Sequence, residues 1–312
     1  MNIIIDGNWL LHSSMGKEIK ELSLKMDGEG ILKMRLKDSL SSHMSEIIGK
    51  FDFMNNLPTV YLVKDSHSWR KDLNIPESLM QMDIKYKGQR NHSKDCDFSK
   101  IATIFDEWFA EAKAGACLVS QNNLEGDDCI LMLVNKFKAS KQNTVIVSSD
   151  ADLTQLCYTG DFWFVAALSP FDGIVYAEQE IKHAAALFNP LFSFILHFEK
   201  SKTVTRDKII VNKILFGDVS DNIQSIGTVM RNGKKFNVTE KRLLAVLPEK
   251  IKTHDELSKM KQEIASAVHE IVPELSVEEI LNRLAYNEKL VILDESYLPQ
   301  DEVKIIRENI GG

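Results

Sequence analysis

Cysteine is scarce in this 312-residue chain, and the sequence holds no long apolar run. The four cysteines, Cys96, Cys117, Cys129 and Cys157, form no CxxC pair, which argues against structural zinc and against a disulfide framework. We expect Cys117 and Cys129, which lie in apolar segments, to be small core residues. No stretch of 18 apolar residues occurs, so no transmembrane helix is expected. The first residues also lack a basic segment followed by an apolar one, which predicts a cytoplasmic protein without a signal peptide.

Several catalytic signatures are missing as well. We find no Ser-His-Asp set, no Walker phosphate-binding loop and no cluster of His and Cys that could hold zinc. These absences argue against serine hydrolases, P-loop enzymes and zinc enzymes. The apolar content of 44% nevertheless supports a packed core, and the length suits one large domain or two smaller ones.

The first 170 residues alternate between strand and helix patterns, which predicts an α/β fold with a mainly parallel sheet. Strands are expected at 2–5, 59–63, 116–119, 144–148 and 162–166, and helices at 31–50, 98–113 and 124–138. The basic, polar stretch 66–97 interrupts the alternation, and we interpret it as a functional insertion. After about residue 180 helical periodicity dominates, with helices expected at 179–198, 206–216, 239–247, 254–271, 276–289 and near 300–309, and a strand-like run at 289–293.

Nine carboxylates occur where predicted strands end or predicted helices begin. They are Asp6, Asp65, Glu125, Asp127, Asp128, Asp150, Asp152, Asp218 and Asp221. Residues just past the carboxyl ends of parallel strands line one crevice, so these acids would repel one another there unless cations were bound. Oxygen ligands favour hard cations such as Mg²⁺ or Mn²⁺. Several carboxylates around one crevice suit two ions that stabilise the attacking and leaving oxygens of a phosphodiester.

Each acid taken singly has a simpler interpretation as a helix cap or a partner of the helix dipole. This interpretation suits Glu125, Asp127, Asp128 and Asp218. We expect Asp218 and Asp221 to open a helix after Gly217. Asp6 and Asp150, which follow apolar strands, are harder to explain as caps, and the set as a whole favours a metal centre.

The net charge of −7 argues at first against a nucleic-acid partner. Nine of the negative charges belong to the candidate ligands, however, and further acids are concentrated after residue 249. From Lys64 to Lys94 the sequence contains seven basic residues and four acidic ones. Two more basic clusters follow, at Lys200, Lys202, Arg206, Lys208 and Lys213, and at Arg231, Lys234, Lys235, Lys241 and Arg242. Such local patches, rather than the global charge, indicate phosphate binding.

Four short motifs together resemble the 5′-nuclease (flap endonuclease, FEN-like) superfamily, and within it the RNase H type of T-even-like bacteriophages. The matching segments are Ile5-Asp6, Glu125-Gly126-Asp127-Asp128, Ser149-Asp150-Ala151-Asp152-Leu153-Thr154-Gln155-Leu156 and Gly217-Asp218-Val219-Ser220-Asp221-Asn222-Ile223, in the family's order. The resemblance implies a PIN-like parallel-sheet nuclease domain flanked by helices over 1–190. An arch or clamp insertion would occupy about 66–97, and a mainly helical, duplex-binding region would span 191–312.

The resemblance also implies roles for the acids. Asp6, Asp65, Glu125, Asp127 and Asp150 would hold a first Mg²⁺ directly or through water, and Asp128, Asp152, Asp218 and Asp221 would surround a second. Asp6, Asp65 and Asp150 would be the catalytic carboxylates.

A basic motif of the family, placed near the base of the arch, matches Tyr86-Lys87-Gly88-Gln89-Arg90. Lys87 and Arg90 would contact the scissile phosphate, and Tyr86 would stack on an unpaired base. Further candidates for phosphate contacts are Arg70, Lys71, Lys234 and Lys235. The repeated glycines with which many members bind duplex backbone and a monovalent cation are missing from residues 226–235.

The sequence therefore predicts a Mg²⁺-dependent 5′→3′ exonuclease and flap endonuclease that removes RNA primers and 5′ flaps in phage DNA replication, with Mn²⁺ as a substitute metal. The expected partners are DNA with a 5′ flap or end, RNA–DNA hybrids, and a single-stranded-DNA-binding or clamp protein. We expect a monomer in the host-cell cytoplasm, without a membrane partner. One alternative is a haloacid-dehalogenase-like phosphohydrolase, which needs a second acid where Asn8 stands. Another is a non-catalytic nucleic-acid-binding protein on the same fold.

Overall fold

The computed structural model describes residues 1–25, 27–51, 58–82, 84–88, 95–112, 115–160, 163–169, 174–177, 200–203, 206–247 and 250–311. The chain divides into two units that each combine segments distant in sequence. Unit 1 contains residues 1–67, 92–204 and 293–312, and unit 2 contains residues 68–91 and 205–292. The predicted helix at 179–198 and the predicted boundary near 190 lie outside the described residues.

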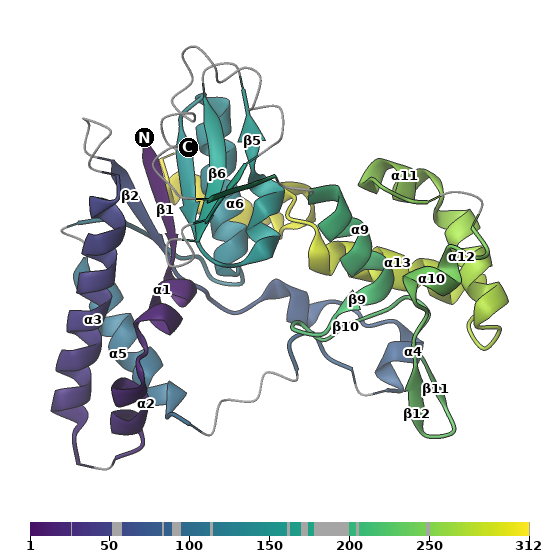
Figure 1. Cartoon of the computed structure of the whole chain (residues 1–312), viewed down its shortest axis with the longest axis horizontal. Helices are drawn as coiled ribbons and strands as arrows, with labels where there is room; N and C mark the ends of the chain where they lie inside the picture. Colours follow the sequence, from purple (N-terminus) through teal and green to yellow (C-terminus); the bar gives the residue numbers. More distant parts are fainter. Residues whose placement is uncertain are drawn as a thin grey trace. The chain divides into compact units, whose positions relative to one another are not determined.

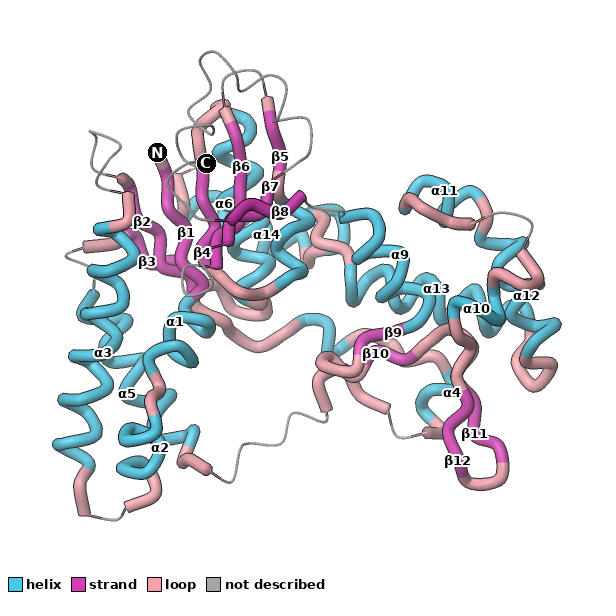
Figure 2. Tube along the Cα trace, in the orientation of Figure 1, coloured by secondary structure: helices cyan, strands magenta, loops and turns pink. Residues whose placement is uncertain are grey.

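A twisted, mostly parallel sheet forms the centre of unit 1 (Figures 1 and 2). Its order is β3 (Cys117–Val119), β2 (Thr59–Val63), β1 (Asn2–Asp6), β4 (Thr144–Val147), β6 (Phe164–Ser169), β7 (Ile174–Ala177) and β8 (Lys200–Thr203), with β5 (Tyr158–Thr159) also paired to β6. The five strands from β3 to β6 are mutually parallel. All five strands expected from the sequence are present, which confirms the predicted α/β class.

Helices cover both faces of this sheet. The helices α1 (Gly7–Ser14), α2 (Lys17–Ser23), α3 (Glu29–Gly49) and α5 (Phe98–Glu111) lie on one face, and α6 (Gly126–Ala139) lies on the other. Ile3 and Ile5 join the core cluster formed with α3 and α5. On the opposite face, the ring of Tyr61 lies 5.1 Å from that of Phe137 in α6. Strands buried on both faces explain why the sequence shows continuous apolar runs rather than alternation.

The last part of the chain packs against α6. It contains the 3-10 helix η5 (Glu295–Tyr297) and α14 (Gln300–Asn309). The Lys136 ammonium donates hydrogen bonds to the carbonyls of Ile310 and Gly311, and the Gln121 amide donates to Glu302 at 2.6 Å. The closing helix was predicted at these residues, and these contacts place it in unit 1.

Unit 2 is built mainly from helices. They are α4 (Glu77–Met80), α9 (Arg206–Phe216), α10 (Glu240–Leu243), α11 (His254–Lys259), α12 (Lys261–Ile271) and α13 (Val277–Val291), with the 3-10 helix η2 (Trp69–Asp72). Two small hairpins, β9 (Gly217–Asp218) with β10 (Ile223–Gln224) and β11 (Val229–Arg231) with β12 (Lys234–Phe236), complete it. The buried Arg283 of α13 donates to the Ser78 hydroxyl at 2.9 Å and to the Thr228 carbonyl at 2.6 Å. The described part of the insertion around Ser78 therefore packs within this helical unit.

Several local expectations were wrong. The strand-like run at 289–293 instead contains the last turn of α13, because Leu290 and Val291 continue the buried stripe of Tyr286 and Asn287 at helical spacing. The stretch 254–271 forms two helices, which are separated at Met260.

Two further features differ from expectation. Cys117 is exposed rather than buried, because β3 is the edge strand of the sheet. The helices α1 and α2 were not anticipated. Among the described residues, no helix has both the length and the apolar character needed to cross a membrane.

Candidate active site

Three of the predicted acids follow three neighbouring strands of unit 1. In the parallel register Asp6 pairs with Val63 of β2, and the preceding residue, Ile5, pairs with Val147 of β4. Asp65 and Asp150 therefore lie just beyond the carboxyl ends of the strands on either side of Asp6. Ser148 follows β4, and its hydroxyl donates to the Asp6 carboxylate oxygen Oδ2 at 2.8 Å. The order β2-β1-β4 thus brings the three strand-end acids to one edge of the sheet.

The first turn of α6 brings further acids to Asp65. The Asp65 carboxylate accepts hydrogen bonds from the backbone N–H of Gly126 and from the side-chain amide of Asn8. Glu125 is the N-cap residue of α6, and its backbone N–H donates to the fully buried Asp128 carboxylate at 3.1 Å. Asp127 lies between them in the same turn. Together these contacts place the Glu125–Asp128 segment beside the end of β2.

Asp6 and Asp150 both cap helices, which corrects the expectation that they are harder to explain as caps. Asp6 accepts from the backbone N–H groups of Asn8 at 3.0 Å and Trp9 at 3.2 Å, and so caps α1. Asp150 accepts from the N–H of Asp152 at 2.8 Å and caps the 3-10 helix η4 (Ala151–Leu156). The chain passes directly from strand to helix at both places, so the strand-end residue becomes the cap. A carboxylate has two oxygens, so capping leaves a ligand role open.

The electrostatics of unit 1 show that these acids lie close enough to interact. Burial raises the pKa of Asp6 to about 6, and the negative charges of Asp65 and Asp150 add to the increase, although hydrogen bonds from Ser148 and Trp9 oppose it. Burial likewise raises the pKa of the Cys129 thiol to about 12, with contributions from Asp128, Asp65 and Asp127. A group of carboxylates that destabilises its own charge, and offers only oxygen ligands, fits a hard divalent cation such as Mg²⁺.

Asp218 is the last residue of β9 and Asp221 lies in the turn between β9 and β10, which corrects the expectation of a helix start. Gly217 has φ +81°, and a Cβ there would lie 2.3 Å from the Ile223 carbonyl oxygen, so the chain reverses instead of entering a helix. Asp218 accepts from the backbone N–H of Ser220 at 2.8 Å and from its hydroxyl at 2.6 Å. These bonds stabilise the turn in the way that short acidic side chains often do.

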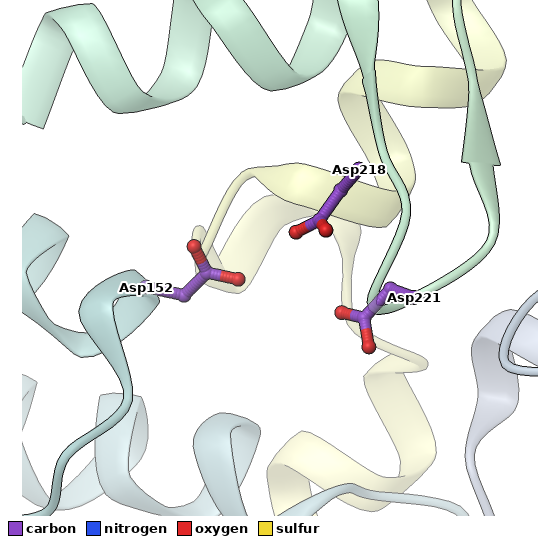
Figure 3. A group of neighbouring side chains, drawn as sticks. All are labelled: Asp152, Asp218 and Asp221. Carbon is purple, nitrogen blue, oxygen red and sulfur yellow. The ribbon is translucent and has the colours of Figure 1, made fainter. Parts of the chain in front are cut away.

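The charge state of Asp218 is set by its neighbours in unit 2. Burial works to raise its pKa, but the Lys213 ammonium at 2.5 Å and the Ser220 hydrogen bonds outweigh burial and lower the pKa. Asp218 and Asp221 each offer an oxygen within 4.8 Å of the other. Figure 3 shows these two side chains on the green β9–β10 segment, and Asp152 on the teal segment of η4 in unit 1. The β9–β10 segment therefore presents two neighbouring carboxylates, of which Asp218 is paired with Lys213.

The basic motif of the insertion contacts this same turn. The backbone N–H of Lys87 donates to the Asp221 carbonyl at 2.8 Å, and the Asn222 side-chain amide donates to the Lys85 carbonyl at 2.8 Å. The Lys87 ammonium lies 5.0 Å from the ring centre of Tyr86, which is buried. Unit 2 thus joins two predicted motifs that are more than 130 residues apart, a contact that no pattern in the sequence revealed. Arg90 lies outside the described residues.

The remaining basic candidates differ in exposure. Lys71 and Lys234 are exposed. Arg70 is buried, with its guanidinium 4.8 Å from the Trp69 ring centre, which argues against a phosphate contact. Lys235 donates to the Gln224 side-chain oxygen at 2.9 Å.

Comparisons with known proteins support the fold. Residues 38–185 match the model of a family described as 5'-3' exonuclease, N-terminal resolvase-like domain. The curated proteins include none that this sequence matches.

Three solved structures from bacteriophage T5 share the fold. A 5'-exonuclease with bound zinc is 14% identical, with a TM-score of 0.55. A protein co-crystallised with metal ions is 16% identical, with a TM-score of 0.57. A flap endonuclease variant in a pseudo-enzyme-product complex with DNA and metal ions is 15% identical, with a TM-score of 0.51. Each comparison covers 99% of this chain and 97% of the other.

Proposed function

We propose that this chain is a metal-dependent nuclease of the 5′-nuclease superfamily, and that it acts as a Mg²⁺-dependent 5′→3′ exonuclease and flap endonuclease. The observation that carries the proposal is the group of strand-end carboxylates around Asp6, whose mutual repulsion a divalent cation would relieve. The proposed substrates are DNA with a 5′ flap or end and RNA–DNA hybrids. The bacteriophage T5 proteins of the same fold, one of them in complex with DNA, support a substrate of this class.

We assign two sets of ligands to two Mg²⁺ ions. Asp6, Asp65, Glu125, Asp127 and Asp150 would hold the first, and Asp128, Asp152, Asp218 and Asp221 would surround the second. When bound, such ions lower the pKa of a water molecule and stabilise charge on the phosphate oxygens.

The protein's own groups would do the remaining work. The Lys87 ammonium, held beside the Tyr86 ring, would contact the scissile phosphate and offset the charge that develops on it. Arg90 would act similarly. The exposed Lys71 and Lys234, with Lys235, would bind backbone phosphates farther from the cut. The biological role we propose is removal of RNA primers and 5′ flaps in phage DNA replication, alongside a single-stranded-DNA-binding or clamp protein.

A cleavage assay tests the proposal directly. A 5′-labelled flap and an RNA-primed duplex would each be incubated with the protein in Mg²⁺, in Mn²⁺ and in EDTA. We expect short 5′ products with either metal and intact substrate in EDTA. A protein that binds the flap but never cuts it would instead support the non-catalytic alternative.

Gly126 tests the contact between α6 and Asp65. A Cβ at this position would lie 2.6 Å from an Asp65 carboxylate oxygen, so Gly126→Ala should displace Asp65. We expect cleavage to fall by about tenfold, because small misplacements in an active site are costly. Gly30→Ala in the first turn of α3 is the matched control, since nothing lies within 4 Å of a Cβ there. Equal rates for the two variants would contradict the role given to this contact.

A further inference from the structure

A chain of side-chain amides in unit 2 connects the β11–β12 hairpin to the basic motif. The Lys235 ammonium donates to the Gln224 side-chain oxygen at 2.9 Å. The Gln224 amide nitrogen donates to the Asn222 side-chain oxygen at 3.0 Å, and the Asn222 amide nitrogen donates to the Lys85 carbonyl at 2.8 Å. Asn222 is buried, and both of its polar side-chain atoms are used. The chain therefore ends two residues before Lys87.

The order of donors and acceptors along this chain is fixed by its first member. An ammonium group can only donate, so the oxygen of Gln224 must face Lys235. The amide nitrogen of Gln224 then faces Asn222, whose oxygen must accept it. This leaves the Asn222 nitrogen to donate to the Lys85 carbonyl. Each amide meets its protein partners in the observed orientation, so the chain favours that orientation of Asn222.

The backbone strengthens the same connection. Asn222 has φ +57° and Lys87 has φ +53°, a left-handed conformation that asparagine tolerates better than most residues do. The bond from the Lys87 N–H to the Asp221 carbonyl lies beside the bond from Asn222 to the Lys85 carbonyl. Two neighbouring bonds in opposite directions limit both translation and rotation of the 85–87 segment against the β9–β10 turn.

We infer that Asn222 is a positioning residue, which sets the place of the Lys87 ammonium relative to the Asp218 and Asp221 carboxylates, and that Gln224 and Lys235 hold Asn222 in the required orientation. The inference rests on the proposed function of Lys87 at the scissile phosphate. It also assigns a second task to the β11–β12 hairpin. Both adjacent lysines of the hairpin are exposed and can bind duplex backbone, and Lys235 also donates to the amide chain.

Asn222→Gly is the decisive variant, because glycine keeps the left-handed backbone and removes only the side chain. We expect the single-turnover cleavage rate at saturating substrate to fall about tenfold, with little change in substrate affinity. The matched control is Asn232→Gly. Asn232 also has a positive φ, +51°, but it is an exposed residue of the β11–β12 turn. The cleavage rate of Asn232→Gly should therefore equal that of the unmodified protein. If both variants cleave at the rate of the unmodified protein, the inference is overturned.

A double-mutant cycle separates positioning from a general structural role. Lys87→Ala should lower the rate about a hundredfold, and adding Asn222→Gly to Lys87→Ala should change it by less than about twofold, because the residue that Asn222 positions is gone. An undiminished tenfold effect in the Lys87→Ala background would overturn the inference. Gln224→Ala provides a second variant if Asn222→Gly does not fold. We expect it to lower the cleavage rate about threefold when Lys87 is present, and not to lower it in the Lys87→Ala variant.

Limited trypsin digestion tests the same contact without any cleavage assay. Trypsin cuts after lysine, so peptides ending at Lys85 and Lys87 report how firmly this segment is held. We expect these peptides to appear several-fold faster in Asn222→Gly than in Asn232→Gly. Equal rates would overturn the inference even in a protein without nuclease activity. Conversely, faster digestion together with no cleavage of flaps by the unmodified protein would reject the proposed function and leave the contact supported.

Discussion

Replacing Asp150 by asparagine is expected to lower the single-turnover cleavage rate by about 1,000-fold or more, while the thermal midpoint and the affinity for a flapped DNA change little. Asparagine retains an oxygen that can accept the N–H of Asp152, so the cap of η4 is kept. Only the negative charge beside Asp6 is lost. If that charge holds a metal ion, its removal takes away stabilisation of the transition state, which commonly costs a factor of this size.

Asp294→Asn is a closely matched control. Asp294 is also an exposed aspartate that caps a 3-10 helix of unit 1, and it accepts the N–H of Ser296 at the same distance of 2.8 Å. Both variants lose one charge and keep one cap, so any general effect of the substitution appears in both. The measurements are single-turnover kinetics in Mg²⁺, a thermal melt, and flap binding in EDTA. Cleavage by Asp150→Asn at the rate of Asp294→Asn would remove Asp150 from the catalytic set.

The sequence predicts most of the sheet because the strands are apolar on both faces. Thr144–Val147 and Thr59–Val63 are uninterrupted segments rich in β-branched residues, and such runs favour a buried strand. Helix α9 was predicted with its observed bounds, Arg206–Phe216, since its buried residues recur at helical spacing. Helix α1 was missed because Gly7 and Asn8 are poor helix formers. Its stability comes from the Asp6 cap and from the burial of Trp9, Leu10 and Leu11.

The candidate site was predictable where it depends on strand ends, and unpredictable where it depends on long-range contacts. Asp6 and Asp150 could be assigned to one edge because parallel strands place their carboxyl ends together. The contact between Lys87 and Asp221 depends on how the insertion packs in unit 2, where the buried Arg283 donates to both Ser78 and Thr228. A lone arginine in an amphipathic helix is usually a solvated charge. The sequence around Arg283 therefore does not predict its burial or its bonds to Ser78 and Thr228.

Replacing Asp6 by asparagine is expected to stabilise the metal-free protein at pH 8 by about 3 kcal/mol, the free energy that corresponds to a pKa raised from 3.8 to about 6. The folded state binds a proton at Asp6 more tightly than the unfolded state does. The contribution of Asp6 to stability is therefore greatest below about pH 4 and is lost as the pH rises through about 6, where its carboxylate ionises in the folded protein. Asparagine carries no charge at any of these pH values, so the gain from Asp6→Asn should appear at pH 8 and shrink toward zero near pH 4.

The hydrogen bonds of Asp6 survive this substitution, which makes the charge the only large change. The remaining oxygen can still accept the N–H groups of Asn8 and Trp9, and the new amide can donate to the Ser148 hydroxyl, which also accepts. Urea unfolding in EDTA at several pH values measures the effect, and Asp38→Asn on the exposed face of α3 controls for the loss of one charge. Adding Mg²⁺ should reverse the ranking, because an ion that binds only the folded protein stabilises the unmodified chain by mass action and the variant less. A pH-independent difference between the two proteins in EDTA would mean that the pKa of Asp6 is not raised in the folded protein. The proposed metal centre would then lose its main physical support.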